Sequence, residues 1–308
     1  MDGILIIDKP QGITSHDVVS LLRRKTGIRK IGHSGTLDPM ATGVLPVFIG
    51  KATKIIEYAN MPDDPEAKIY RCTMRLGFET DTQDIWGSRL EKPSQTAEFQ
   101  LSLVKHKDEI ERVLKSFEGS GVQRPPLYSA VKVGGRRLYE YARKGISLAD
   151  EKIKERKIYI KYVYVNHINE ETNDVVFDVH CSKGVYIRTL CSDAGKALGC
   201  GGVMSGLTRL RSDSFSIDDA ISVENLKDCD TPFRVLIRAD KPLEWMKRAD
   251  LPENSVIKFT MGQTIALSEK EYLRVRDEQH VRVYNGNSFL GIGKPLETGF
   301  IKPEKILV

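Results

Sequence analysis

The stretch HSGTLDPMATGVL, from His33 to Leu45, is the most informative part of this chain. It contains a single carboxylate, Asp38, which is followed directly by Pro39 and lies between two glycines. Proline fixes its own φ and restricts the residue before it to extended backbone, whereas glycine permits turns that other residues resist. We therefore expect Asp38 to be held on a stiff loop. The spacing alone leaves an ordinary turn open, because aspartate and proline are common turn residues.

Four other segments of the chain carry patterns of the same kind. They are GILIIDKPQGITSHDVV (Gly3–Val19), KIYRCTMRLGFETDTQDIWG (Lys68–Gly87), QRPPLYSAVKVGGRRLYEYARKG (Gln123–Gly145) and CSKGVYIRTLCSDAGKALGCGG (Cys181–Gly202). With the first stretch they resemble, in the same order, the motifs of the TruB family, whose members make pseudouridine at position 55 of the tRNA T-loop. The five blocks cover most of residues 1 to 215. Ser34 departs from the family pattern, which often has glycine there.

The resemblance implies an α+β fold. We expect a mixed-sheet pseudouridine synthase catalytic domain over residues 1–237 and a small β-barrel-like PUA domain, an RNA-binding fold, over residues 248–308. The second domain rests on short apolar runs separated by glycine turns, a pattern typical of small barrels. Residues 281–307 resemble the end of a PUA domain, although short strands with glycines are a generic pattern.

The resemblance also assigns three catalytic residues. Asp38 matches the catalytic aspartate of the family, and Arg188 matches the arginine that pairs with it. Tyr70 matches a tyrosine whose ring stacks on the target base, with its hydroxyl near the reacting atoms. From the residues alone, Arg188 would be a surface arginine and Tyr70 a half-buried strand residue.

Four substrate-binding residues are implied in the same way. Tyr186 and Leu207 match positions that line the base pocket, which Tyr70 shares. His33 matches a histidine that fills the space left by the flipped base. Taken alone, Leu207 is a core residue and His33 a turn histidine. We assign Lys9, in the first motif, to support of the loop and not to the chemistry.

Pseudouridine formation breaks the C1′–N1 glycosidic bond and joins C5 to C1′. Substrate and product are isomers, so the implied reaction requires no cofactor and no metal. Asp38 could attack C1′, add to C6 or assist formation of a glycal, and the sequence does not separate these routes. A desolvating pocket would raise the pKa of Asp38, and a facing cation would counter that shift.

The spacing of the residues does not support a phosphate loop, a dinucleotide-binding site or a metal site. Six residues separate Gly43 from Gly50-Lys51, where a phosphate loop has four, and Ala52 stands where a phosphate loop has serine or threonine. The glycines near residue 200 do not form a dinucleotide fingerprint after a strand. No spacing of histidines and carboxylates resembles a metal site.

The distribution of charge is compatible with RNA as the partner. The net charge is +5, but residues 120–161 hold eleven Lys and Arg against four Asp and Glu, which leaves the rest slightly acidic. Such a concentrated basic segment attracts a phosphate backbone. Tyr128, Tyr139 and Tyr141 lie among these cations, where aromatic rings suit base stacking. A solvated charged face is the alternative. The resemblance, and not the charge, implies the T-arm of tRNA as the partner, with no guide RNA. We also expect a monomeric protein.

The chain lacks the marks of a secreted or membrane protein. Its five cysteines include no C-x-x-C pair and are odd in number, which argues against a zinc ribbon and a disulfide framework. No apolar run approaches the roughly 20 residues that span a bilayer. Asp2 and a run of strand length stand where a signal peptide would. We expect a cytoplasmic protein without membrane contact.

Local patterns predict the main elements. Strands are expected over residues 3–9, 43–50 and 67–77, with a hairpin over 157–168 and 174–181. Helices are expected from a cap at Ser15 to Gly27, over 52–60 and 108–119, and from near Tyr186 to Leu198. Residues 78–107 are expected to form a long connection, 242–246 a short helix, and 249–308 only strands and glycine turns such as 262–264 and 291–293.

Two alternatives remain open at this point. An RNA-binding chaperone that folds tRNA without catalysis would use the same basic segment and PUA-like module. The related guide-RNA-dependent synthases of archaea and eukaryotes are nearer. The presence of Asp38, Tyr70 and Arg188 favours an enzyme, and residues 123–145 look more like those of the stand-alone bacterial form.

Overall fold

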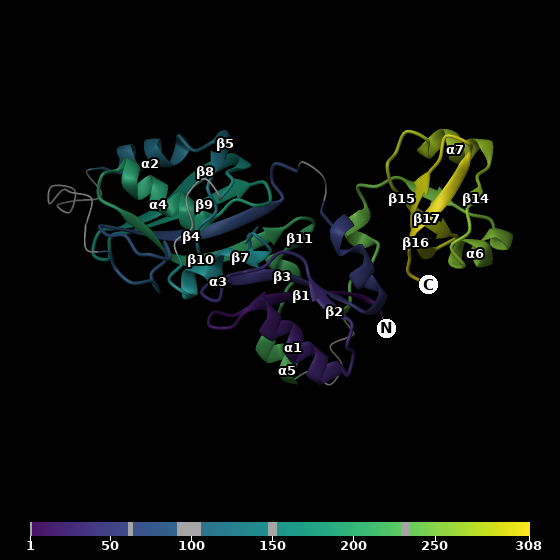
Figure 1. Cartoon of the computed structure of the whole chain (residues 1–308), viewed down its shortest axis with the longest axis horizontal. Helices are drawn as coiled ribbons and strands as arrows, with labels where there is room; N and C mark the ends of the chain where they lie inside the picture. Colours follow the sequence, from purple (N-terminus) through teal and green to yellow (C-terminus); the bar gives the residue numbers. More distant parts are fainter. Residues whose placement is uncertain (1, 61–63, 91–105, 147–152, 229–234) are drawn as a thin grey trace. The chain divides into compact units, whose positions relative to one another are not determined.

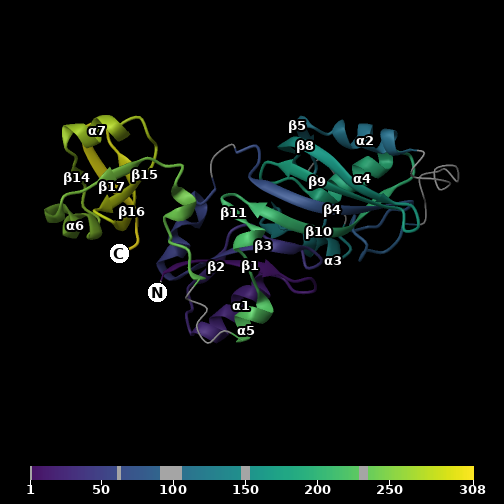
Figure 2. The same cartoon turned by 180° about the vertical axis from the view of Figure 1, so that it is seen from behind.

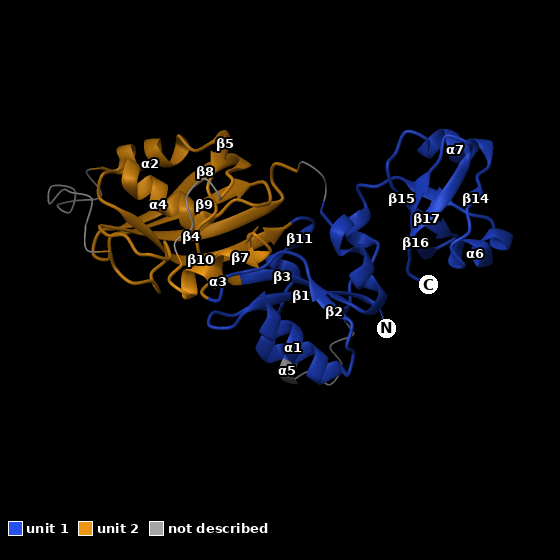
Figure 3. Cartoon of the chain, viewed as in Figure 1, with its two compact units in different colours: residues 1–39, 43–62, 213–308 blue, residues 40–42, 63–212 orange. Residues whose placement is uncertain are grey.

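The computed structural model describes residues 2–60, 64–90, 106–146, 153–228 and 235–308, which form two compact units (Figure 3). Unit 1 comprises residues 1–39, 43–62 and 213–308. Unit 2 comprises residues 40–42 and 63–212. These two units differ from the domains expected from the sequence, residues 1–237 and 248–308. Those domain bounds stay a prediction.

The main sheet of unit 2 is antiparallel, with strands in the order β10-β4-β9-β8-β5 (Figures 1 and 2). They are β4 (Lys68–Leu76), β5 (Gly119–Gln123), β8 (Arg156–Asn169), β9 (Asp174–Cys181) and β10 (Gly202–Ser212). Residues 170–173 close the predicted hairpin of β8 and β9. The predicted strand over residues 67–77 is also confirmed.

The core of unit 2 lies where two helices, α2 (Lys107–Lys115) and α4 (Ile187–Ala197), pack on this sheet. Met74 and Phe177 from the sheet meet Ile110 and Leu190 from the helices, and all four are almost fully buried. Each such side chain stabilises the fold by about 1.5–3 kcal/mol. The predicted helix over 108–119 ends early, because Gly119 already begins β5.

A hairpin and a short helix project from the basic segment of unit 2. The hairpin consists of β6 (Lys132–Val133) and β7 (Arg136–Arg137), and α3 (Leu138–Arg143) follows it. Leu138 is fully buried, whereas the arginines of β7 are exposed.

Unit 1 begins with a small mixed sheet. Its strands are β1 (Gly3–Lys9), β2 (Ile31–His33), β3 (Thr42–Ile49) and β12 (Ile221–Ser222). β1 is antiparallel to β3 and parallel to β12, and β2 pairs antiparallel with β3. The predicted short helix near residues 52–60 is the 3-10 helix η1 (Gly50–Tyr58).

The cap expected at Ser15 is wrong by one residue. Thr14 is the N-cap of α1 (Ser15–Thr26), and it forms a reciprocal capping box with Asp17. The box requires an acceptor three residues after the cap, which Asp17 supplies for Thr14. Gly27 ends the helix in the left-handed conformation, as predicted. The Ser15 hydroxyl is therefore not part of the cap, and it makes another contact that is described below.

Short elements connect the sheet of unit 1 to the C-terminal module, which we define as residues 248–308. They are β11 (Phe215–Ser216), η4 (Ile217–Asp219), α5 (Val223–Asp228) and η6 (Lys241–Leu243). The last of these corresponds to the short helix predicted at 242–246.

The C-terminal module contains a second mixed sheet, in the order β13-β15-β16-β17-β14 (Figure 1). Its strands are β13 (Arg248–Asp250), β14 (Ile265–Ala266), β15 (Val281–Asn285), β16 (Ser288–Pro295) and β17 (Phe300–Ile306). The expected α+β class with mixed sheets and a small β-rich C-terminal part is confirmed.

Two details of the module differ from the prediction. It contains two helices, α6 (Glu253–Thr260) and α7 (Glu269–Val275), where only strands and turns were expected. Gly291 and Gly293 lie inside β16 and not in a turn. A Cβ on Gly291 would come within 1.9 Å of the carbonyl oxygen of Lys305 on β17, so glycine permits the close approach of these strands.

The C-terminal module also completes the core of unit 1. Ile292 and Leu307 pack in one apolar cluster with Ile4 and Phe48 of the N-terminal sheet. Lys305 and Glu57 of η1 form an ion pair at 2.6 Å over this contact. The module is therefore a structural part of unit 1 as well as a small β-rich fold.

Gly195 is the tightest packing point of α4 against the turn that leads into β10. A Cβ at this position would lie 2.1 Å from the backbone nitrogen of Gly202. We expect Gly195→Ala to lower the free energy of unfolding by about 1–3 kcal/mol or more, because overpacked cores typically lose this much stability. Urea unfolding measures this, with Ala197→Ser on the exposed side of α4 as the control. Equal stability of the two variants would contradict the packing argument.

Candidate active site

The loop that carries Asp38 connects β2 to β3 and is fixed on both sides of the aspartate. The hydroxyl of Ser15 accepts a hydrogen bond from the backbone nitrogen of Leu37 at 2.9 Å and donates to the Leu37 oxygen at 3.2 Å. The backbone nitrogen of Gly12 donates to the oxygen of Pro39 at 2.8 Å. Asp38 therefore has restrained neighbours on each side, and its own side chain is half-buried.

Lys9 ties the first motif to this loop from inside the protein. Its side chain is fully buried, and its ammonium donates to the carbonyl oxygens of Pro10 and Ile13 at 2.8 Å and of Pro39 at 3.4 Å. A buried charge is tolerated only when polar groups replace its lost water. The supporting role that we assigned to Lys9 agrees with this geometry.

His33 is the last residue of β2, at the start of the same loop. Its backbone partner is Val47 of β3, and its side chain is half-buried. His33 and Asp38 thus belong to one turn of chain in unit 1. The other predicted site residues belong to unit 2.

Tyr70 and Leu207 share one face of the unit 2 sheet. Tyr70 points to the same side of β4 as Cys72, and Cys72 is the register partner of Leu207 on β10. Both side chains are half-buried and pack at the edge of the apolar core. They are diagonal neighbours, close enough to line one pocket.

The cysteines below this face are packing residues. Cys72 on β4 and Cys191 on α4 are fully buried, with their Sγ atoms 3.4 Å apart. Burial raises the pKa of the Cys72 thiol well above its ordinary value, and burial raises the pKa of Cys181 to about 12. The four cysteines in the described ranges are free; Cys229 lies outside them.

Tyr186 and Arg188 lie at the start of α4. Tyr186 is the N-cap residue, and Arg188 is in the first turn with only 5% of its surface exposed. The amino end of a helix is unfavourable for a cation, because the helix dipole is positive there. The charge of the guanidinium is compensated by the backbone carbonyl oxygens of Thr82 at 3.1 Å and Tyr128 at 2.9 Å, which accept its hydrogen bonds. The carboxylate of Asp84 lies 3.6 Å away.

Sequence reasoning missed Asp84. Its carboxylate lies beside Arg188 and also accepts hydrogen bonds from the Thr82 hydroxyl at 2.8 Å and the Trp86 nitrogen at 3.0 Å. Gly87 permits this tight turn, since a Cβ there would lie 2.2 Å from the Thr82 hydroxyl. The signal was present in the T-D-T-x-D-x-x-G pattern, which contains a carboxylate between turn residues.

The basic segment presents cations around one aromatic ring. Arg137 and Arg143 lie over the ring of Tyr139, with their guanidinium carbons 5.8 and 5.3 Å from its centre. Arg136, Arg137 and Arg143 are exposed, whereas Tyr139 is half-buried. The arrangement agrees with the expected interleaving of cations and aromatics.

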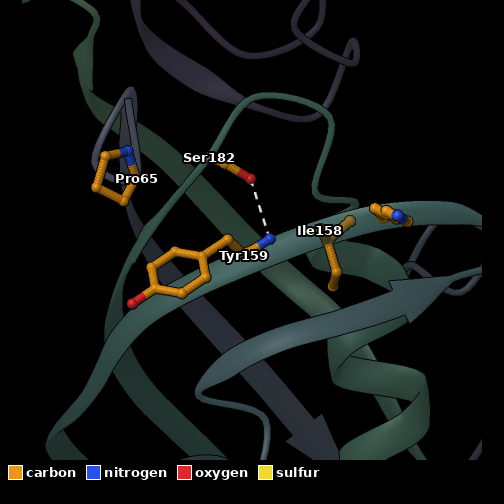
Figure 4. Close-up of a pocket in the computed structure, with 5 residues that line it drawn as sticks. Pro65, Ile158, Tyr159 and Ser182 are labelled. Atoms are coloured by element: carbon orange, nitrogen blue, oxygen red, sulfur yellow. Dashed lines mark hydrogen bonds between the residues drawn. The ribbon is translucent and has the colours of Figure 1, made fainter. Parts of the chain in front are cut away.

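A separate hollow of about 460 Å³ lies elsewhere in unit 2. It is lined by Pro65, Lys157, Ile158, Tyr159 and Ser182, and the hydroxyl of Ser182 accepts a hydrogen bond from the Tyr159 nitrogen at 3.1 Å (Figure 4). The predicted site residues do not line it. This hollow is therefore distinct from the site that the sequence predicts.

The described residues contain neither a metal-binding cluster nor a membrane-spanning helix. No group of three or more His, Cys, Asp or Glu in the described ranges is arranged to hold a metal ion. Within those same ranges, no helix has the length and apolar character needed to cross a membrane.

Three models of one family together match residues 23–244 and 248–307. The model of the TruB family pseudouridylate synthase N-terminal domain matches residues 23–187. The tRNA pseudouridylate synthase B C-terminal domain matches residues 188–244, and the C-terminal model of pseudouridine synthase II TruB matches 248–307. The chain belongs to the TruB family of pseudouridylate synthases.

Individual relatives agree with this assignment. The chain is 41% identical over 300 residues to tRNA pseudouridine synthase B of Alkaliphilus oremlandii, covering 95% of this chain and 93% of the relative. It is 43% identical over 296 residues to the protein of the same name from Clostridium kluyveri, covering 95% of each. These names place the relatives among enzymes that isomerise uridine in tRNA.

A solved structure shares the fold over nearly all of the chain. A Cbf5-Nop10-Gar1 complex contains a chain with a TM-score of 0.68 and 27% identity, covering 99% of this chain and 85% of that one. An archaeal box H/ACA Nop10-Cbf5 complex, at 23% identity and a TM-score of 0.65, supports the fold alone. The pseudouridine synthase fold expected from the sequence is thereby confirmed.

Asp84 lies 3.6 Å from Arg188, the arginine to which the family resemblance assigns a catalytic role, and we predict that it orients the guanidinium. We expect Asp84→Asn to lower the rate of pseudouridine formation by up to roughly 100-fold, since small misplacements of reacting groups have effects of that size. The matched control is Asp178→Asn, which removes a carboxylate from the exposed pair with Arg71 on the unit 2 sheet. Exposed pairs contribute little, so this control should keep its activity. Equal activity of both variants would refute the role of Asp84.

Proposed function

We propose that this enzyme converts the uridine at position 55 in the T-loop of tRNA to pseudouridine. It acts without a guide RNA, and Asp38 is the nucleophile. The observation that carries the proposal is the fixed loop of Asp38, whose neighbours Leu37 and Pro39 are both held by the first motif. A restrained nucleophile loses little orientational freedom when the substrate arrives.

Arg188 is the cation that we assign to Asp38. An arginine keeps its charge at all relevant pH values and can bind a carboxylate through two parallel hydrogen bonds. Its burial at the start of α4 supports this role, because a desolvated cation has a strong electrostatic effect on a nearby anion. In this assignment Arg188 keeps Asp38 ionised as water leaves the site.

The target base must leave the folded T-loop before it can react. Enzymes that modify a base inside a folded nucleic acid flip it into a pocket. We assign Tyr70, Tyr186 and Leu207 to that pocket, and His33 to the space that the base vacates. The shared face of Tyr70 and Leu207 supports the first part of this assignment.

The reaction is balanced without an added reactant. The C1′–N1 bond breaks, the C5–C1′ bond forms, the proton on C5 leaves, and N1 receives a proton. Because nothing is oxidised or reduced, the protein supplies binding, orientation and a carboxylate. We therefore propose that the reaction needs no cofactor.

The choice of tRNA without a guide rests on the close relatives. Proteins that match 93–95% of their own length to this chain are named tRNA pseudouridine synthase B. The exposed arginines of the basic segment suit the phosphates of a T-arm. We assign the C-terminal module to additional RNA contacts away from the reacting base.

The central prediction is that purified protein and unmodified tRNA transcript, with no other component, give pseudouridine at one T-loop position. Carbodiimide adducts mapped by primer extension identify that position. We expect Asp38→Asn to abolish turnover while tRNA affinity stays within several-fold, because the change removes the nucleophilic charge and preserves size. Arg188→Lys should lose most activity, since lysine lacks the bidentate fork.

Several outcomes of this assay would reject the proposal. A product that requires an added guide RNA would assign the chain to the guided class. Unchanged turnover of Asp38→Asn would remove the aspartate from the chemistry. Tight tRNA binding by an inactive wild-type protein would favour an RNA chaperone.

Binding should depend steeply on salt through the basic segment. Each phosphate contact to single-stranded RNA contributes roughly −0.7 to the slope of log K against log salt. Neutralising Arg136, Arg137 and Arg143 together should therefore flatten the slope by about 2. Filter binding at several salt concentrations measures the slope, and an unchanged value would show that these arginines do not contact phosphate.

A further inference from the structure

The carboxamide of Gln123 forms an unusual pairing with the backbone of Tyr186. Gln123 is the final residue of β5, with 6% of its surface exposed. Its Nε2 donates to the carbonyl oxygen of Tyr186 at 3.0 Å, and its Oε1 accepts from the Tyr186 nitrogen at 2.7 Å. One side chain thus satisfies both backbone groups of a single residue, as a neighbouring strand would.

The position of Tyr186 explains why this pairing matters. Tyr186 is extended, with φ −94° and ψ 106°, and it precedes the first turn of α4. Its carbonyl already accepts from the nitrogen of Leu190, but a helix gives no partner to the nitrogen of its N-cap residue. Without Gln123 that nitrogen would need another acceptor, and the start of α4 could shift to find one.

A second contact joins the same two segments. Tyr128, five residues after Gln123, accepts a hydrogen bond from Nη2 of Arg188 at 2.9 Å. Pro125 and Pro126, both buried, restrict the backbone between these contacts. The stretch from 123 to 128 therefore meets the start of α4 at two fixed points, and it continues into the exposed cations of the basic segment.

We propose that Gln123 is a positioning residue for pseudouridine formation, acting through the backbone of Tyr186 on the pocket and on the arginine two residues later. This inference rests on the roles proposed above for Tyr186 and Arg188. Gln123 touches neither the substrate nor the reacting atoms. Gln123 affects the rate of pseudouridine formation within the enzyme–tRNA complex. The exposed cations of the basic segment determine the affinity for tRNA.

Two substitutions separate positioning from stability. Gln123→Met keeps the length of the side chain and removes both hydrogen bonds. Gln123→Glu keeps an acceptor for the Tyr186 nitrogen, and when protonated it also regains a donor for the Tyr186 oxygen. Burial raises the pKa of an introduced carboxylic acid, so a useful fraction is protonated at mildly acidic pH.

The experiment measures single-turnover rates and tRNA dissociation constants across a range of pH, each divided by the wild-type value at the same pH. We expect Gln123→Met to be slower by roughly 10- to 100-fold at all pH values, with affinity within about twofold. The relative rate of Gln123→Glu should rise as pH falls, because the protonated acid mimics the amide. Ile110→Val, in the same core, is the control for mild destabilisation.

Failure of the proposed function and failure of the positioning role of Gln123 give different results in this experiment. An inactive wild-type protein would reject the proposed function and not this inference alone. An active wild type with a wild-type rate for Gln123→Met, or with a loss confined to affinity, would overturn the positioning role. If Gln123→Met does not fold, a relative rate of Gln123→Glu that is independent of pH overturns it equally.

Discussion

A cation that cannot reach water must be solvated by the protein, and this constraint determines the local structure in both units. Lys9 in unit 1 donates to the carbonyl oxygens of Pro10 and Ile13, from the turn after β1, and of Pro39, from the Asp38 loop. Arg188 in unit 2 collects two carbonyls and a carboxylate from segments distant in sequence. In each case the charge fixes several loops at once, because no loop can move away without leaving the cation poorly solvated.

This way of building a site makes loop geometry depend on charge. The turn from Thr80 to Gly87 has few apolar side chains to hold it, yet Asp84 is almost fully buried in it. Its hydrogen bonds to Thr82 and Trp86 define the turn, and its position beside Arg188 joins that turn to α4. Buried polar groups of this kind give a single geometry when every member is satisfied.

The sequence predicted most of the regular structure, since periodicity records which face of an element is buried. The β8–β9 hairpin, β1, β4 and α4 follow their patterns closely. The cap of α1 was misplaced because Thr14 and Ser15 are both good caps, and only Asp17 distinguishes them. The helices α6 and α7 were missed because they are short and flank the glycine turn at residues 262–264, which resembles a hairpin connection. Asp84 and Gln123 were missed as individual residues, since their roles depend on partners far away in sequence.

The packing of Ile292 and Leu307 against Ile4 and Phe48 has a consequence for synthesis on the ribosome. Unit 2 is almost one continuous stretch of chain, so its antiparallel sheet can form as soon as that stretch has emerged. The core of unit 1 needs residues from both ends, and contacts of such long sequence separation form slowly. The apolar surface of the nascent N-terminal strands therefore stays exposed until the C-terminal residues have been translated. Exposed apolar surface of this kind favours aggregation during that interval.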